Sequence, residues 1–287
     1  MMKKLMMLCV AAMAATGAWS ATYTAEIDGS TWSYTLSIAP DMTTNATITA
    51  VTPADGALIV PSQVDGYIVK AIGSYVGKDC ENITLLKIPD SVTGISGGAF
   101  TYCTSLGELI LGDGLTGIGG YSGSYVDTDS NNDYEQYGAF AGCVNLTNIV
   151  FGSSLETIGN QCFARCTSLP SLSLPDTVTS LGNQCFYGSE NLCSVSIGTG
   201  LESMGQYAFT TCTALKSVEF RPCDTGKLII SEGAFRWCSE LEEVAFSDAI
   251  KSFRPDAFNS CSALKRVVIS DSVTGISGGA FTYCTSL

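Results

Sequence analysis

The stretch Asp90–Leu106, which reads DSVTGISGGAFTYCTSL, occurs a second time without a single change as Asp271–Leu287. Between these two copies the same pattern returns in looser form, and a phenylalanine marks each return. The marker residues are Phe100, Phe140, Phe163, Phe186, Phe209, Phe235, Phe258 and Phe281, separated by 40, 23, 23, 23, 26, 23 and 23 residues. The two irregular spacings equal 23 plus 17 and 23 plus 3, so the period is 23 residues with two insertions. A fixed period of this length predicts a solenoid, in which each repeat forms one rung of a stack.

Each repeat divides into segments with different periodicities. It opens with a triplet such as Leu106-x-x-Leu109-x-Leu111, whose last two leucines lie two residues apart and therefore point to the same side of a strand. A turn, a second short extended piece and an Ala-Phe-x-x-Cys segment follow, and the glycine before this segment favours a short helical or 3₁₀ turn. We therefore predict an α/β solenoid with a curved parallel β-sheet on the concave face. Short strands and 3₁₀ or helical turns are expected on the opposite side.

The N-terminal region does not follow the repeat. Residues 1–20 combine two lysines, an apolar segment and the small-x-small tripeptide Ala18-Trp19-Ser20, which predicts a secretory signal peptide. Residues 21–57 are expected to form a β cap over the first rung, because Thr31–Ile38 alternates between apolar and polar residues and Ala46–Val51 reads as a second strand.

Residues 58–287 are predicted to hold nine rungs, with the longer insertion at about 120–137. A solenoid that stopped at Leu287 would leave Val267, Ile269 and Ile276 at an uncovered apolar edge. The expectation is that the sequence is truncated at its C-terminus and that the array is longer.

The repeat as a whole can be written L-x-x-[LVI]-x-[ILF]-P-x-x-V-x-x-I-G-x-x-A-F-x-x-C, and it covers residues 58–287. This pattern resembles the BspA-like leucine-rich repeats of bacterial surface proteins. The resemblance implies a secreted or surface-displayed curved solenoid, which in some members is an adhesin for host matrix proteins or for other bacteria. The family motif has no catalytic residues to transfer to this sequence.

Composition excludes several classes of function. The chain has 14 Lys and Arg against 27 Asp and Glu, and its formal net charge of −13 becomes −15 once the two lysines of residues 1–20 are removed. Such an acidic chain repels phosphate backbones, so nucleic acid is not an expected partner. The chain has no histidine, which excludes Ser-His-Asp and Cys-His nucleophile systems and His-containing zinc sites. We expect no enzyme and no transmembrane segment in the mature chain.

The outward positions on the first strand of each repeat are the candidate recognition site, because extended solenoid surfaces commonly bind proteins. The polar and charged residues at these positions are Glu108, Asn148, Ser171, Ser173, Ser194, Ser196, Ser217, Glu219, Glu243 and Arg266. The alternative is that serine merely tolerates the crowded inner face of a curved sheet.

Twelve of the 13 cysteines lie after residue 20. Eight occupy one column of the repeat, namely Cys80, Cys103, Cys143, Cys166, Cys212, Cys238, Cys261 and Cys284, and Ser189 takes the ninth position. A disulfide framework is one interpretation, and buried free thiols that fill a small apolar slot are the other. We favour thiols, because columns that run from rung to rung follow packing.

The insertion at 120–137 is acidic. Four of its residues alternate with small polar residues as the ligands of a calcium loop do, and they are Asp127, Asp129, Asn131 and Asp133. The match is partial, since Asn132 stands where an EF-hand needs glycine. A solvated acidic loop is the alternative. The tyrosines Tyr121, Tyr125, Tyr134 and Tyr137 make the insertion a second candidate contact surface.

Together these features predict a secreted or cell-surface leucine-rich-repeat protein that mediates protein–protein recognition or adhesion through its extended surface. Its partners would be host matrix or surface proteins, or other bacteria, and calcium in the insertion is the one cofactor considered. Two alternatives stay open: the repeat region of a larger secreted enzyme, and a structural spacer without a ligand of its own.

Overall fold

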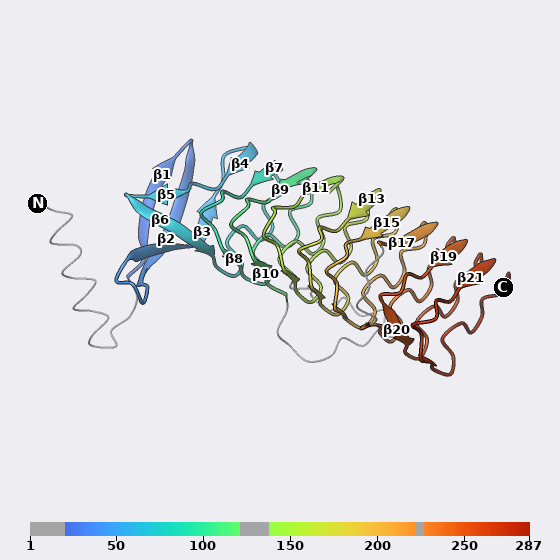
Figure 1. Cartoon of the computed structure of the whole chain (residues 1–287). Coiled ribbons are helices and arrows are strands. Elements are labelled where there is room, and N and C mark those ends of the chain that lie inside the picture. The colour runs from blue at the N-terminus through green and yellow to red at the C-terminus, as the bar shows by residue number, and fades with distance from the viewer. Residues whose placement is uncertain (1–20, 121–137, 222–226) are drawn as a thin grey trace, which may run out of the picture.

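The computed structural model describes residues 21–120, 138–221 and 227–287, which form an elongated stack of β-strand rungs (Figure 1). The cap consists of three antiparallel strands, β1 (Tyr23–Ile27), β2 (Ser30–Ile38) and β3 (Thr44–Thr52). Trp32 and Tyr34 of β2 are buried, because their alternating positions face the first rung. β3 pairs in parallel with β6 of the first rung, so the cap continues a sheet of the solenoid.

Two rows of parallel strands run along the solenoid, one strand of each row per rung. The first row, which we call the strand face, contains nine strands in the described part of the chain and occupies one side in Figure 1. These strands are β4 (Gly56–Ile59), β7 (Ile83–Lys87), β9 (Glu108–Ile110), β11 (Asn148–Val150), β13 (Ser171–Ser173), β15 (Ser194–Ile197), β17 (Ser217–Phe220), β19 (Glu243–Ala245) and β21 (Arg266–Val268). The predicted solenoid of about nine turns with a period of 23 is confirmed.

The second row lies on the opposite side. Its strands are β6 (Tyr67–Ile72), β8 (Gly94–Ile95), β10 (Gly117–Ile118), β12 (Thr157–Ile158), β14 (Ser180–Leu181), β16 (Ser203–Met204), β18 (Leu228–Ile230), β20 (Ile250–Phe253) and β22 (Gly275–Ile276). A short strand, β5 (Gln63–Val64), pairs antiparallel with β6. This row is continuous from the cap to β16, and β18, β20 and β22 form a separate sheet.

The strand face is also divided into two sheets, and the division falls between β11 and β13. At the position before each strand, the backbone N–H donates to the rung before it, as Cys193 does to Pro170 at 2.8 Å and Lys216 to Cys193 at 2.9 Å. Pro170 occupies this position in its own rung and has no N–H to donate towards Thr147. The ladder therefore loses a bond at the place where the two sheets separate.

The repeated phenylalanines form a stacked column inside the solenoid. The rings from Phe100 to Phe258 are fully buried, and their successive centroids lie 5.8, 5.4, 5.4, 5.3, 5.2 and 5.1 Å apart with interplanar angles of 11° or less. In the first rung Gly77 takes the phenylalanine position, and a Cβ there would lie 2.6 Å from the Phe100 ring. From the second rung onwards, aromatic stacking thus links each rung to the next.

The segments that carry these phenylalanines are turns. The described residues contain neither α-helix nor 3₁₀-helix, so the helical part of the predicted α/β class is not confirmed. The physical reason lies in left-handed backbone conformations two residues after every phenylalanine of the column, and two residues before every one except Phe140, as at Gln184 (φ 55°) and Gly188 (φ 68°) around Phe186. Right-handed helix cannot pass through such residues.

The cysteine column lies beside the phenylalanine column, and every member from Cys103 onwards is a hydrogen-bond donor. Each thiol donates to the backbone oxygen three positions before its counterpart in the preceding rung, as Cys212 does to Phe186 at 3.4 Å and Cys238 to Phe209 at 3.3 Å. Ser189 replaces the thiol by a hydroxyl and keeps the bond, donating to the Phe163 oxygen at 3.4 Å. All eleven cysteines of the described part are free thiols, and eight of them are buried. Cys223 lies outside the described residues.

Candidate functional site: the strand face

The structure aligns most of the predicted recognition residues in two exposed columns on the strand face. One column runs through Ser171, Ser194, Ser217, Glu243 and Arg266, which are partners in the pairing of β13, β15, β17, β19 and β21. The second runs through Ser173, Ser196 and Glu219. Since parallel strands lie about 4.8 Å apart, successive side chains within each column lie in contact range of one another.

Glu108 and Asn148 lie apart from these columns. They are paired on β9 and β11, beyond the division at Pro170, and the Asn148 amide donates to the Glu108 carboxylate at 3.1 Å. The ten predicted residues therefore fall on two sheets, with eight of them on the sheet that β13 to β21 form.

A depression of about 460 Å³ opens on this larger sheet between β17 and β19. Its lining residues are Ser217, Val218, Glu219, Phe220, Glu243, Phe246 and Ser247, three of which are predicted recognition residues. Phe220 and Phe246 are buried, with ring centroids 5.7 Å apart, and they give the depression an aromatic lining. The carboxylates of Glu219 and Glu243 are exposed beside it. The depression thus combines apolar surface with negative charge.

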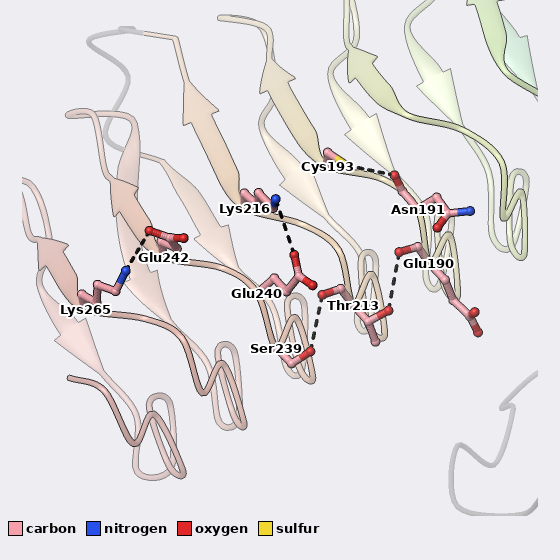
Figure 2. Close-up of polar contacts among 9 residues, drawn as sticks. All are labelled: Glu190, Asn191, Cys193, Thr213, Lys216, Ser239, Glu240, Glu242 and Lys265. Atoms are coloured by element: carbon pink, nitrogen blue, oxygen red, sulfur yellow. Dashed lines mark hydrogen bonds and ion pairs between the residues drawn. The ribbon is translucent and has the colours of Figure 1, made fainter.

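Ion pairs between rungs surround the depression. Arg266 pairs with Glu243 on the face itself. Where the chain enters the strands, Lys265 Nζ lies 2.9 Å from Glu242 and Lys216 Nζ lies 3.8 Å from Glu240 (Figure 2). The ammonium of Lys265 donates to Glu242 and holds the pKa of that carboxyl below its ordinary value.

The entry edge of the strands also carries polar contacts that continue the repeat. Figure 2 shows the Thr213 hydroxyl donating to the Glu190 backbone oxygen at 3.5 Å and the Ser239 hydroxyl donating to that of Thr213 at 3.4 Å. Cys193 is exposed here, and its thiol donates to the Asn191 oxygen at 3.2 Å.

Sequence reasoning missed Lys216, Glu240, Glu242 and Lys265 as part of this surface. A signal was present, because Lys265 follows Glu242 by one period of 23 residues and Arg266 follows Glu243 by the same distance. Residues one period apart are neighbours in a solenoid, so opposite charges at this spacing predict an ion pair.

The calcium-loop hypothesis for Asp127, Asp129, Asn131 and Asp133 stays a prediction, because these residues lie outside the described part of the chain. Within residues 21–120, 138–221 and 227–287, no group of three or more His, Cys, Asp or Glu side chains could hold a metal ion. The same residues include no helix with the length and apolar character needed to cross a membrane.

A family model described as BspA type leucine rich repeat region, in six copies, matches residues 69–128, 136–227 and 224–287. The chain belongs to the BspA type leucine-rich repeat family. Membership supports a protein-interaction repeat scaffold for this BspA type protein. Comparison with curated proteins gave no match.

The solved structures that resemble this BspA type protein are leucine-rich repeat proteins, and the likeness to the T. pallidum protein supports a shared fold. The T. pallidum leucine rich repeat protein is 21% identical with a TM-score of 0.55, and the alignment covers 80% of this chain and 87% of that one. A leucine rich cell surface protein from Faecalibacterium prausnitzii is 21% identical over 94% of both chains, with a TM-score of 0.40. The pneumococcal vaccine antigen PcpA is 16% identical over 92% of this chain and 87% of its own, with a TM-score of 0.38.

Proposed function

We propose that this chain is a secreted or cell-surface recognition protein that binds other proteins, as an adhesin does, through the part of the strand face formed by β13 to β21. The observation that supports this most directly is the depression between β17 and β19. It lies among exposed serines and ion-paired charges, on a surface where two columns of side chains are presented at a regular spacing.

The size of the surface is compatible with this proposal. The five strands β13 to β21 span roughly 20 Å at about 4.8 Å each, and the whole strand face of nine rungs gives an edge of roughly 40 Å, which accommodates a protein interface of standard size. The short side chains of Ser171, Ser194 and Ser217 leave the backbone accessible, and the neighbouring charged columns provide specificity. The proposal includes a concave strand face and secretion through the signal peptide at 1–20. The proposed partners are host matrix proteins or other bacteria.

The test is a binding assay with residues 21–287 immobilised, using purified vertebrate matrix proteins and intact cells of other bacteria as probes. Ser194→Arg places a long cation in the middle of the serine column and should weaken binding of any captured probe about tenfold by steric and electrostatic mismatch. Ser203→Arg is the matched control, because Ser203 is an exposed serine in β16 on the opposite row. Equal binding by both variants, or no probe bound by the parent chain, would contradict the proposal.

A further inference from the structure

We infer that the depression between β17 and β19 receives a cationic side chain, most simply an arginine, from the protein partner, with Glu219 as its counter-ion. The inference rests on the proposed function for its biological meaning, and it specifies the chemistry that the site selects. It follows from the charges around the depression, from its aromatic lining and from its volume.

The charges near the depression leave one carboxylate uncompensated. Lys216, Lys265 and Arg266 pair with Glu240, Glu242 and Glu243 respectively. Of the two carboxylates that line the depression, Glu243 is paired with Arg266, whereas Glu219 has no ion-pair partner among the described residues. The Ser196 hydroxyl donates to Oε2 of Glu219 at 3.5 Å.

The nearest cation in the sequence is held elsewhere. Arg221 follows β17 directly, two residues after Glu219, yet its guanidinium lies 2.8 Å from Asp176, two rungs earlier, and donates to the Leu174 backbone oxygen at 2.9 Å. Two contacts therefore hold Arg221 away from Glu219. Negative charge remains beside the depression, where a cation from outside can reach it.

The lining of the depression selects the kind of cation. Phe220 and Phe246, which are only 5% and 6% exposed and whose rings are tilted by 42°, contribute apolar lining, and Ser217 and Ser247 offer hydroxyls beside it. A guanidinium on a three-carbon stem fits this lining, since the stem contacts apolar surface and the guanidinium donates up to five hydrogen bonds. A volume of about 460 Å³ has room for one such side chain. A small hydrated metal ion would leave the aromatic surface unused.

The probe is a short peptide with a single arginine between serines and alanines, and the measurement is an NMR titration of isotope-labelled residues 21–287. The expected result is that amide shifts concentrate on Ser217–Phe220 and Glu243–Ser247. Replacing the arginine by citrulline, which keeps the shape and removes the charge, should weaken binding about fivefold, as expected for an exposed ion pair.

Glu219→Gln should give the same loss of about fivefold, because it removes the counter-ion and keeps the side-chain size. The matched control is Glu202→Gln, an exposed glutamate next to β16 on the opposite row, which should leave peptide binding unchanged. Shifts spread over the acidic surface, equal binding of the citrulline peptide, or an unaffected Glu219→Gln variant would each overturn the inference.

These outcomes are separable from those of the proposed function. A chain that binds a protein partner in a manner sensitive to Ser194→Arg and insensitive to Glu219→Gln is a recognition protein without an arginine site. A chain that binds the arginine peptide at Glu219 and captures none of the protein or cell probes keeps the arginine site and loses the proposed adhesive function.

Discussion

The interior columns and the strand face differ in how much the residue type changes from one rung to the next. Inside the solenoid one side chain recurs in rung after rung, so that phenylalanine follows phenylalanine from Phe100 to Phe281 and a thiol or hydroxyl donor accompanies each. On the strand face the side chain changes along a column, from Ser194 through Ser217 to Glu243 and Arg266. The interior is constrained by contact with the next copy of itself, whereas the face is constrained by solvent and by what binds there. Stability should therefore depend on the interior and specificity on the face.

The largest effect expected of the interior is alkaline instability. Burial raises the pKa of the thiols at Cys143, Cys162, Cys166, Cys185 and Cys238, and it raises the pKa of Cys212 to about 12 from an ordinary value of 9.0. Their contribution to stability is complete below pH 9 and is lost as the pH rises towards these folded values, because the unfolded chain then releases protons that the folded chain keeps. Each thiol should lower the free energy of unfolding by about 1.4 kcal/mol per pH unit in this window. The six together should therefore lower it by several kcal/mol by about pH 10.

Urea unfolding at pH 8, 9 and 10 measures this loss. Cys212→Ser should reduce the slope of the free energy of unfolding against pH by the equivalent of about one proton. Cys193→Ser, at an exposed thiol, should leave this slope unchanged. A free energy of unfolding that stays constant from pH 8 to pH 10 would mean that these six cysteines are not protonated buried thiols.

The next effect sharpens the contrast between one interior column and one face column. Phe186→Ala removes a fully buried ring that stacks on both neighbours, with centroids 5.4 and 5.3 Å away, and should lower the free energy of unfolding by about 3–5 kcal/mol. Ser194→Ala, at an exposed position in the adjacent strand β15, should change it by less than about 0.5 kcal/mol. Chemical unfolding of both variants gives the comparison, which fails if the two losses are similar.

The smallest effect concerns the single hydroxyl in the thiol column. Ser189→Ala removes the donor to the Phe163 oxygen and should cost about 1 kcal/mol. Ser189→Cys introduces the cysteine that all the other rungs have at this position. Its free energy of unfolding should lie within about 0.5 kcal/mol of that of the parent chain. Thermal unfolding of the pair decides whether the column is defined by hydrogen bonding. A larger loss for Ser189→Cys than for Ser189→Ala would show that the volume of the slot matters more.

Much of this architecture could be predicted from the sequence because a solenoid repeats its constraints. The period of 23 placed Phe163, Phe186 and Phe209 in one column and Cys212 and Cys238 in another, and the structure stacks both. The outward residues of each triplet, such as Ser194 and Ser196, could be assigned to the strand face because side chains alternate along a strand.

Other features could not be predicted, since they depend on how a rung meets its neighbour. The left-handed conformations at Gln161, Gln184 and Trp237 have no marker in residue type, and they turn an expected helical segment into a series of turns. Pro170 was visible in the sequence. Its effect could be predicted only with the knowledge that the backbone N–H at this position donates to the preceding rung. The uncompensated charge of Glu219 depends on where the Arg221 side chain lies, and the pairing of Arg221 with Asp176 two rungs away follows no local pattern.

The division at Pro170 has a mechanical consequence for a protein under tension. A force applied along the long axis of a solenoid loads its hydrogen-bonded ladders in series, so every rung boundary carries the same pull. At the boundary between β11 and β13 the strand-face ladder is interrupted, while β12 and β14 stay paired on the opposite row. The load there shifts to the second row and to the turns, which makes this boundary the weakest on the described strand face, as the boundary between β16 and β18 is on the opposite row. A stretched molecule therefore has one yielding point on each row, and the one on the strand face lies outside the sheet that carries Ser171 to Arg266.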